Sequence, residues 1–171
     1  MAKMNSLCDK EIITALYEAS CAGVKVEMII RGICCLKAGV PGLSENISVR
    51  SIVGNFLEHS RIFFFLNDGE EELYMGSADW MPRNLDRRVE ILFPVLDDTL
   101  KEKVKHILDV ELADNTKAHV LKPDGEYEKI DRRGKVLVNS QKQFCEEAVA
   151  AVPKTDHVYR ERVFVPAEPA E

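Results

Sequence analysis

The chain has 171 residues, of which 46% are hydrophobic and 30% charged, and its formal net charge is −6. This length suits one domain with an ordinary hydrophobic core, and this composition excludes a disordered or a membrane-embedded class of protein. The negative net charge excludes attraction of polyanions by bulk electrostatics, so any phosphate site must depend on a local cluster of cationic side chains.

The first half of the chain predicts strands and helices in alternation. Asp9 precedes an apolar stripe of helical spacing and is placed to cap a helix. Residues 24–30 are almost continuously apolar, as expected of a strand that is covered on both faces. The elements expected in this half are the end of a strand at the first residues, a helix over 11–23, strands over 24–30 and 47–51, a helical turn over 52–58, and a hairpin of strands over 61–66 and 72–75.

The second half predicts one more central strand and two long helices. Its expected elements are a strand over 89–95, a helix over 101–112, a strand over 118–121 and a helix over 140–151. This order predicts an α/β fold, in which one mixed β-sheet is flanked by α-helices. We expect one domain over residues 1–152, followed by a polar and acidic tail over residues 153–171.

The N-terminus and the cysteines lead to expectations about location. The first residues contain no apolar leader, and the longest apolar run, residues 91–96, is far shorter than the ~20 residues that span a bilayer. Five cysteines without a C-x-x-C pair predict buried free thiols in a reducing compartment. Together these features predict a cytoplasmic protein without a transmembrane segment.

Neither of the common glycine-rich phosphate loops occurs in the sequence. Gly134 and Lys135 are followed by Val136 instead of serine or threonine, and no G-x-G-x-x-G is present. If this chain handles nucleotides, it does so without either loop.

The segment from His59 to Glu90 concentrates residues that suit phosphoryl transfer. His59 and Arg61 are two positions apart at the start of a predicted strand, so we expect their side chains on one face. An arginine fork neutralises phosphate oxygens, and a histidine moves a proton near neutral pH. Arg31 stands at the carboxyl end of another predicted strand, where α/β sheets usually bind their ligands.

A second group of polar residues follows the predicted hairpin. Small residues around Ser77 let a phosphate approach the backbone, and Ser77 itself can donate to it. Arg87 and Arg88 add cationic charge. Glu90 opens an apolar predicted strand, where an unpaired carboxylate is costly, so we expect His59 or an arginine as its partner. Structural ion pairing and a solvated charged face are the alternative interpretations of this group.

The order of these residues resembles the phospholipase D superfamily, whose motif is His-x-Lys, a later Gly-Ser-x-Asn and then a Glu. Here Arg61 stands in the place of the lysine and Asp79 in that of the asparagine. The chain is far more similar to the C-terminal domain of the long-chain bacterial polyphosphate kinases, over roughly residues 3–150. The segments that carry this resemblance are 3–7 (KMNSL), 30–36 (IRGICCL), 41–46 (PGLSEN), 56–62 (FLEHSRI), 77–81 (SADWM) and 83–85 (RNL).

The resemblance implies an enzyme that reversibly transfers the terminal phosphate of ATP to polyphosphate through a phosphohistidine. In that family the phosphorylated histidine lies on the first of two phospholipase D-like domains, and this chain is similar to the second. Arg31 and His59 match residues that contact the phosphates of ATP, and Glu90 matches a carboxylate close to that histidine. The implied catalytic residues are His59 and Glu90, and the implied ATP or phosphate contacts are Arg31, His59, Arg61, Ser77, Arg87 and Arg88.

The resemblance also implies which components lie outside this chain. ATP and ADP would be substrates, whereas the residues associated with Mg²⁺ and the aromatic that stacks on adenine belong to the upstream part, so no metal site is expected here. The implied partners are the upstream domains of the same polypeptide and inorganic polyphosphate, with no nucleic acid, in a homo-oligomeric enzyme of the cytoplasm or the membrane surface. We expect the isolated chain to be inactive alone. Because it reads as beginning within a strand, we also expect an exposed sheet edge there.

Two other functions stay open at this point. One is a non-catalytic polyanion-binding module that uses the arginines and His59 without turnover. The other is a phospholipase D-like phosphodiesterase that builds its site from two copies in a homodimer, which the replaced lysine and asparagine disfavour.

Overall fold

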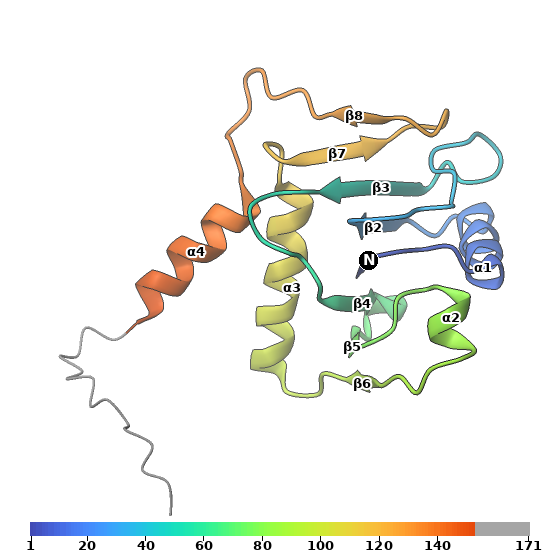
Figure 1. The fold of residues 1–171 in the computed structure, drawn as a ribbon, viewed down its shortest axis with the longest axis horizontal. Coiled ribbons are helices and arrows are strands. Elements are labelled where there is room, and N and C mark those ends of the chain that lie inside the picture. The colour runs from blue at the N-terminus through green and yellow to red at the C-terminus, as the bar shows by residue number, and fades with distance from the viewer. Residues whose placement is uncertain (153–171) are drawn as a thin grey trace, which may run out of the picture.

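Three parallel strands form the centre of the sheet. The computed structural model, which describes residues 1–152, places β1 (Ala2–Met4) beside β2 (Val26–Ile30), and β2 beside β3 (Ile47–Ile52) (Figure 1). Antiparallel strands extend both sides, in the order β6-β5-β4-β1-β2-β3-β7-β8. The outer strands are β4 (Arg61–Phe65), β5 (Glu72–Gly76), β6 (Leu92–Pro94), β7 (Ala118–Leu121) and β8 (Tyr127–Lys129). The predicted α/β fold with a mixed sheet is confirmed.

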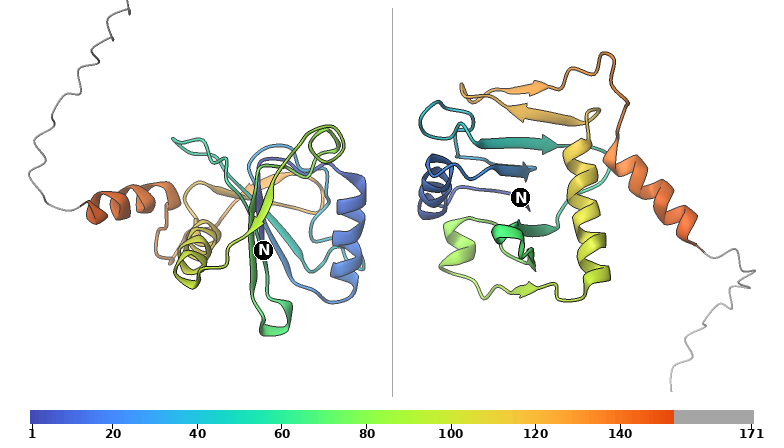
Figure 2. Two further views of the ribbon diagram at one scale, coloured as in Figure 1. Left: turned by 90° about the horizontal axis from the view of Figure 1, so that it is seen from below. Right: turned by 180° about the vertical axis from the view of Figure 1, so that it is seen from behind.

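Helices cover both faces of this sheet. Figure 2 shows α1 and α3 on opposite sides of the strands. Each begins behind an aspartate that caps it: Asp9 accepts a hydrogen bond from the Ile12 N–H at 3.0 Å, and Asp97 accepts one from the Leu100 N–H at 2.9 Å. The helices are α1 (Lys10–Cys21), α2 (Pro82–Leu85), α3 (Asp98–Ala113) and α4 (Ser140–Ala151).

Alternate side chains of the central strands fill two hydrophobic cores. Met28 and Ile30 of β2 belong to the core on the α1 side, against which Leu16 packs. Ile29, between them, belongs to the core on the α3 side together with Leu108. Burial on both faces explains why the sequence of β2 is nearly continuously apolar, as predicted.

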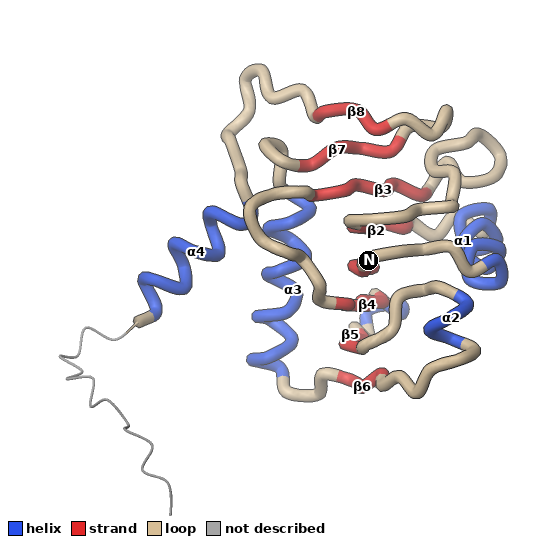
Figure 3. Tube along the Cα trace, in the orientation of Figure 1, coloured by secondary structure: helices blue, strands red, loops and turns tan. Residues whose placement is uncertain are grey.

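Two of the predicted elements are wrong. Residues 53–60 form a loop instead of a helical turn (Figure 3), since Gly54 and Asn55 are poor helix formers and the backbone of Phe56 is hydrogen-bonded to a distant side chain. The expected central strand over 89–95 is the three-residue edge strand β6, because Pro94 has no N–H to donate and is confined to a sheet edge.

Several smaller expectations also need correction. Neither α2 nor β8 was predicted from the sequence pattern. The first strand is not an exposed edge, because β1 pairs with β2 on one side and with β4 on the other. None of the five free cysteines is fully buried, and Cys21, Cys35 and Cys145 are exposed. The predicted tail over 153–171 lies outside the described residues. Within residues 1–152, no helix has the length and apolar character needed to cross a membrane.

Candidate functional site

An open cleft of about 680 Å³ lies at the carboxyl ends of the three parallel strands. Asn5 and Ser6 line it directly after β1, and Arg31 lines it directly after β2. Residues 53–57 contribute the wall that follows β3, and Met81 and Arg83 approach from the α2 side. The predicted place for ligand chemistry in an α/β sheet is therefore a real depression in this protein.

Arg31 is held in this cleft by its neighbours. Its Nε donates to the Oδ1 of Asn5 at 2.9 Å, and its Nη2 donates to the same oxygen. Its backbone carbonyl accepts a hydrogen bond from the Ser51 hydroxyl at 3.0 Å. Arg31 lines the cleft and its Nη1 has no hydrogen bond within residues 1–152, so this oriented guanidinium can bind an anion there.

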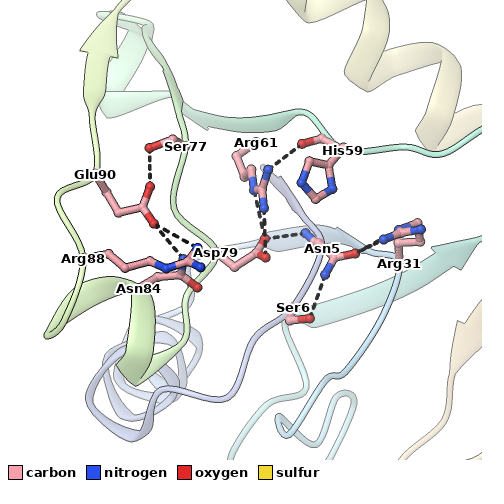
Figure 4. A network of polar contacts seen from close by, with 10 residues as sticks. All are labelled: Asn5, Ser6, Arg31, His59, Arg61, Ser77, Asp79, Asn84, Arg88 and Glu90. Carbon is pink, nitrogen blue, oxygen red and sulfur yellow. Dashed lines mark hydrogen bonds and ion pairs between the residues drawn. The ribbon is translucent and has the colours of Figure 1, made fainter.

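His59 lies in the loop before β4, and its side chain is exposed. In Figure 4 its ring extends from the loop toward Asn5 and Arg31. Within the described residues the ring makes no hydrogen bond, whereas the carbonyl oxygen of His59 accepts one from Nη1 of Arg61 at 2.9 Å. Arg61 thus holds the backbone of His59, while the ring has no hydrogen bond within residues 1–152 that would compete with a ligand.

Arg61 and Asp79 form a largely buried ion pair next to Asn5 (Figure 4). Nε and Nη2 of Arg61 donate to the two oxygens of Asp79 at 3.1 and 3.0 Å. The carboxylate also accepts the backbone N–H of Asn5 at 2.8 Å. Burial alone would raise the pKa of Asp79, but the hydrogen bonds from Arg61 and Asn5 outweigh it and leave the pKa below its ordinary value. Arg61 therefore points at a protein carboxylate and not into the cleft.

Glu90 belongs to a second network, on the far side of the loop after β5. It accepts hydrogen bonds from the Ser77 hydroxyl and from Nδ2 of Asn84, the latter at 2.7 Å, and Nη1 of Arg88 lies 4.0 Å away. These hydrogen bonds lower the pKa of Glu90 below its ordinary value. The partner expected for Glu90 was His59 or an arginine, and of these only Arg88 contacts it. The reason is that the segment before β6 runs along the sheet edge, where the Ile91 N–H binds Ser77 at 3.0 Å.

The structure thus divides the predicted site residues into two groups (Figure 4). Arg31 and His59 are linked through Asn5, Asp79 and Arg61. A separate network contains Ser77, Glu90 and Arg88, while Arg87 is exposed and makes no salt bridge within residues 1–152.

Asn5 is the site residue that the sequence reasoning missed. Its position directly after a strand of the parallel centre was the available signal, and it matches that of Arg31 after β2.

A metal site does not emerge from the described part of the chain. Nowhere in residues 1–152 do three His, Cys, Asp or Glu side chains gather so as to hold a metal ion. The anion-binding capacity of the cleft rests on Arg31 and on Arg83 at its rim.

Comparison with known proteins assigns the family. The model of the family described as polyphosphate kinase C-terminal domain 2 matches residues 1–141. The chain belongs to this family. The resemblance seen in the sequence is therefore confirmed, and so is its assignment to the second of the two C-terminal domains.

Relatives in this family are long proteins of which the chain covers a small part. It is 53% identical to the polyphosphate kinase of Lactiplantibacillus plantarum over 155 residues, which are 91% of this chain and 21% of that protein. It is 53% identical to the polyphosphate kinase of Pseudomonas aeruginosa over 153 residues, 89% of this chain and 22% of the relative. The crystal structure of a polyphosphate kinase from Porphyromonas gingivalis matches with a TM-score of 0.83 and 43% identity, over 87% of this chain and 23% of that one. The chain spans about a fifth of the length of these relatives.

Proposed function

We propose that this chain is the C-terminal part of an ATP:polyphosphate phosphotransferase and forms one wall of its active site. Arg31 and His59 would bind and act on the phosphates, and the phosphohistidine would be supplied by a preceding domain. The observation that carries this proposal is the oriented guanidinium of Arg31 in a cleft at the carboxyl ends of the parallel strands, with the ring of His59 extending toward it from the loop before β4 (Figure 4). Membership of the family selects polyphosphate and ATP as the phosphate compounds.

The proposed roles follow from the polar groups of each side chain that have no hydrogen-bond partner within residues 1–152. Arg31 would stabilise the charge on the transferred phosphoryl group, and His59 would donate a hydrogen bond or a proton to the leaving oxygen. In phosphoryl transfer a protein acts mainly by positioning the reacting groups. Hydrogen bonds hold the side chain of Arg31 and the backbone carbonyl of His59 in place.

The structure narrows the list of residues that we assign to substrate. The polar atoms of Arg61, Ser77 and Glu90 are taken up by protein partners, so we assign these three to positioning. Arg87 and Arg88 are exposed and would meet only the outer part of a long polyanion. As the family resemblance implies, Mg²⁺ for the whole enzyme would be bound by other domains.

A chimaera tests this proposal. In the Pseudomonas aeruginosa polyphosphate kinase, the matched segment of 153 residues is replaced by this chain, and ATP formation from polyphosphate and ADP is followed by luminescence. We expect His59→Ala and Arg31→Ala each to lower the rate by at least about a hundredfold, in line with the loss of one preorganised electrostatic contact. Arg133→Ala, which removes an exposed arginine outside the cleft, is the control and should leave the rate unchanged.

Other results would select the other functions. If the chain binds polyphosphate in a salt-dependent manner that Arg31→Ala removes, but the chimaera forms no ATP, the chain would be a polyanion-binding module. Hydrolysis of a simple phosphodiester by the chain itself, lost in His59→Ala, would indicate a phosphodiesterase. The cytoplasmic location and the homo-oligomeric parent enzyme stay predictions that fractionation and light scattering of the whole enzyme would test.

A further inference from the structure

The loop that carries His59 is held by one side chain from the far end of the chain. Residues 53–60 contain no helix or strand, yet the amide of Gln141 in α4 binds both backbone groups of Phe56. The Phe56 N–H donates to Oε1 of Gln141 at 3.0 Å, and Nε2 of Gln141 donates to the Phe56 carbonyl at 2.9 Å. Gln141 is only 6% exposed, so these two hydrogen bonds are partly shielded from water.

The same amide reaches the residue directly before His59. Nε2 of Gln141 donates to Oε1 of Glu58 at 2.8 Å, and Oε2 of Glu58 lies 3.4 Å from Nζ of Lys3. Lys3 is 2% exposed and also lies 3.3 Å from Oε1 of Glu111. Burial raises the pKa of Glu111 to about 8, which favours its neutral form near pH 7 and leaves Lys3 mainly as the counter-ion of Glu58. The backbone of His59 is thereby fixed on its N-terminal side.

The anchoring of Gln141 is itself rigid. The preceding residue, Ser140, donates from its backbone N–H and its hydroxyl to Oδ2 of Asp114, at 2.8 and 2.9 Å, and both residues are fully buried. Gly54 leaves room for the amide, because a Cβ there would lie 2.3 Å from Oε1 of Gln141. The match to the family model ends at residue 141, and so includes Gln141 but not the rest of α4.

From these contacts we propose that Gln141 is a positioning residue for His59, acting through Phe56 and Glu58. This inference rests on the proposed function of His59. Arg31 is positioned by a different set of contacts, through Asn5 and Ser51, so loss of Gln141 leaves the phosphate-binding arginine in place. Phe56 also lines the cleft, so the loss should lower kcat far more than it raises KM.

The test uses Gln141→Met in the chimaera described above. Methionine keeps the volume and removes the polar head, and a misplacement of the histidine by about 1 Å costs up to a hundredfold in rate. We expect kcat to fall about ten- to a hundredfold, with KM for ADP and polyphosphate within twofold of the parent. Gln143→Met is the matched control on the same helix, because within residues 1–152 the side chain of Gln143 hydrogen-bonds only to Glu147, and it should keep the full rate.

A second variant and a second measurement keep the inference open to refutation. Gln141→Glu keeps the acceptor for Phe56 but loses both donations and faces Glu58 with a like charge, so it should lower kcat in the same way. In the 171-residue chain, NMR of the histidine rings should show a shifted His59 signal in Gln141→Met. The signal of His106, which contacts Glu147 of α4 at 3.0 Å, should stay in place. If both signals move, α4 has loosened as a whole, and the specific role of Gln141 is refuted.

The outcomes separate this inference from the proposed function. If His59→Ala abolishes activity and both variants of Gln141 keep the parent kcat, Gln141 does not position His59, and the proposed function stands. If His59→Ala retains the parent rate, the proposed function fails and the inference fails with it. A rise in KM at constant kcat would also overturn the inference, since it would show that Gln141 serves binding.

Discussion

The ion pair between Arg61 and Asp79 should be one of the largest single contributions to the stability of this chain. Asp79 is 3% exposed, and the side chain of Arg61 is 11% exposed. Replacing Asp79 by alanine removes two hydrogen bonds from Arg61 and one from the Asn5 N–H, and it leaves a guanidinium charge with little access to water.

The expected cost follows from these three contacts. Hydrogen bonds to a charged group are worth about 1.5–3 kcal/mol each, so three of them sum to about 4.5–9 kcal/mol. The desolvation of Asp79 opposes this sum, and measurements on broken buried pairs give about 3–5 kcal/mol. We therefore expect Asp79→Ala to lower the free energy of unfolding by about 3–5 kcal/mol, which is a large share of the about 5–15 kcal/mol that a domain possesses.

Urea unfolding of the chain, followed by the fluorescence of its single tryptophan, measures this loss. With a slope of about 2 kcal/mol per molar urea, the midpoint should fall by about 1.5–2.5 M. Asp131→Ala is the matched control, since Asp131 makes the same two-bond contact with Arg133, but with side chains 60% and 92% exposed. Because both side chains of that pair are exposed, it should leave the midpoint almost unchanged.

The pH dependence of the stability lost in Asp79→Ala supplies an independent check. The pKa of Asp79 is lower in the folded chain than its ordinary value of 3.8, so its contribution is complete above that value. The contribution is lost as the pH falls through the lower folded pKa. Equal costs for Asp79→Ala and Asp131→Ala at pH 7 would refute the reasoning, because burial would then make no difference between the two pairs.

Three further results are expected. Glu111→Gln should flatten the pH dependence of urea unfolding, because the folded pKa of Glu111, about 8, exceeds its ordinary 4.5, and its contribution to stability declines as the pH rises between these values. Asn5→Ala should weaken polyphosphate binding about tenfold in titration calorimetry by freeing Arg31, while the backbone contact to Asp79 is kept. Ser77→Ala should shift the apparent pKa of Glu90 upward in NMR titration, as it removes a hydrogen bond to the carboxylate.

The sequence allowed the centre of the fold to be predicted from local patterns. The apolar run of β2, the cap at Asp9 and the hairpin of β4 and β5 each depend on neighbouring residues, and each formed as expected. The prediction of a central strand over 89–95 was wrong because apolar residues occur in central and edge strands alike. Pro94, which lies within this segment, is the residue that confines it to an edge. The helical turn over 52–58 failed for another reason, since that loop is shaped by Gln141, more than eighty positions away.

The site shows the same division. Arg31 and His59 could be proposed from the sequence because their residue types and their positions next to strands are local features. Which carboxylate pairs with which arginine depends on how β5 and β6 lie in the sheet, so the pairing of Arg61 with Asp79 and of Glu90 with Ser77 could not be read from spacing. Long-range pairing of side chains is the part of the site that needed the structure.

We propose above that this chain supplies half of a composite active site. The most direct test incubates the chain alone with polyphosphate and ADP and follows ATP by luminescence, with the Pseudomonas aeruginosa chimaera assayed in parallel. We predict no ATP from the chain alone and sustained ATP formation by the chimaera, abolished by His59→Ala. ATP formation by the isolated chain, lost in His59→Ala, would contradict the proposal of a shared active site, since the site would then be complete without a second domain.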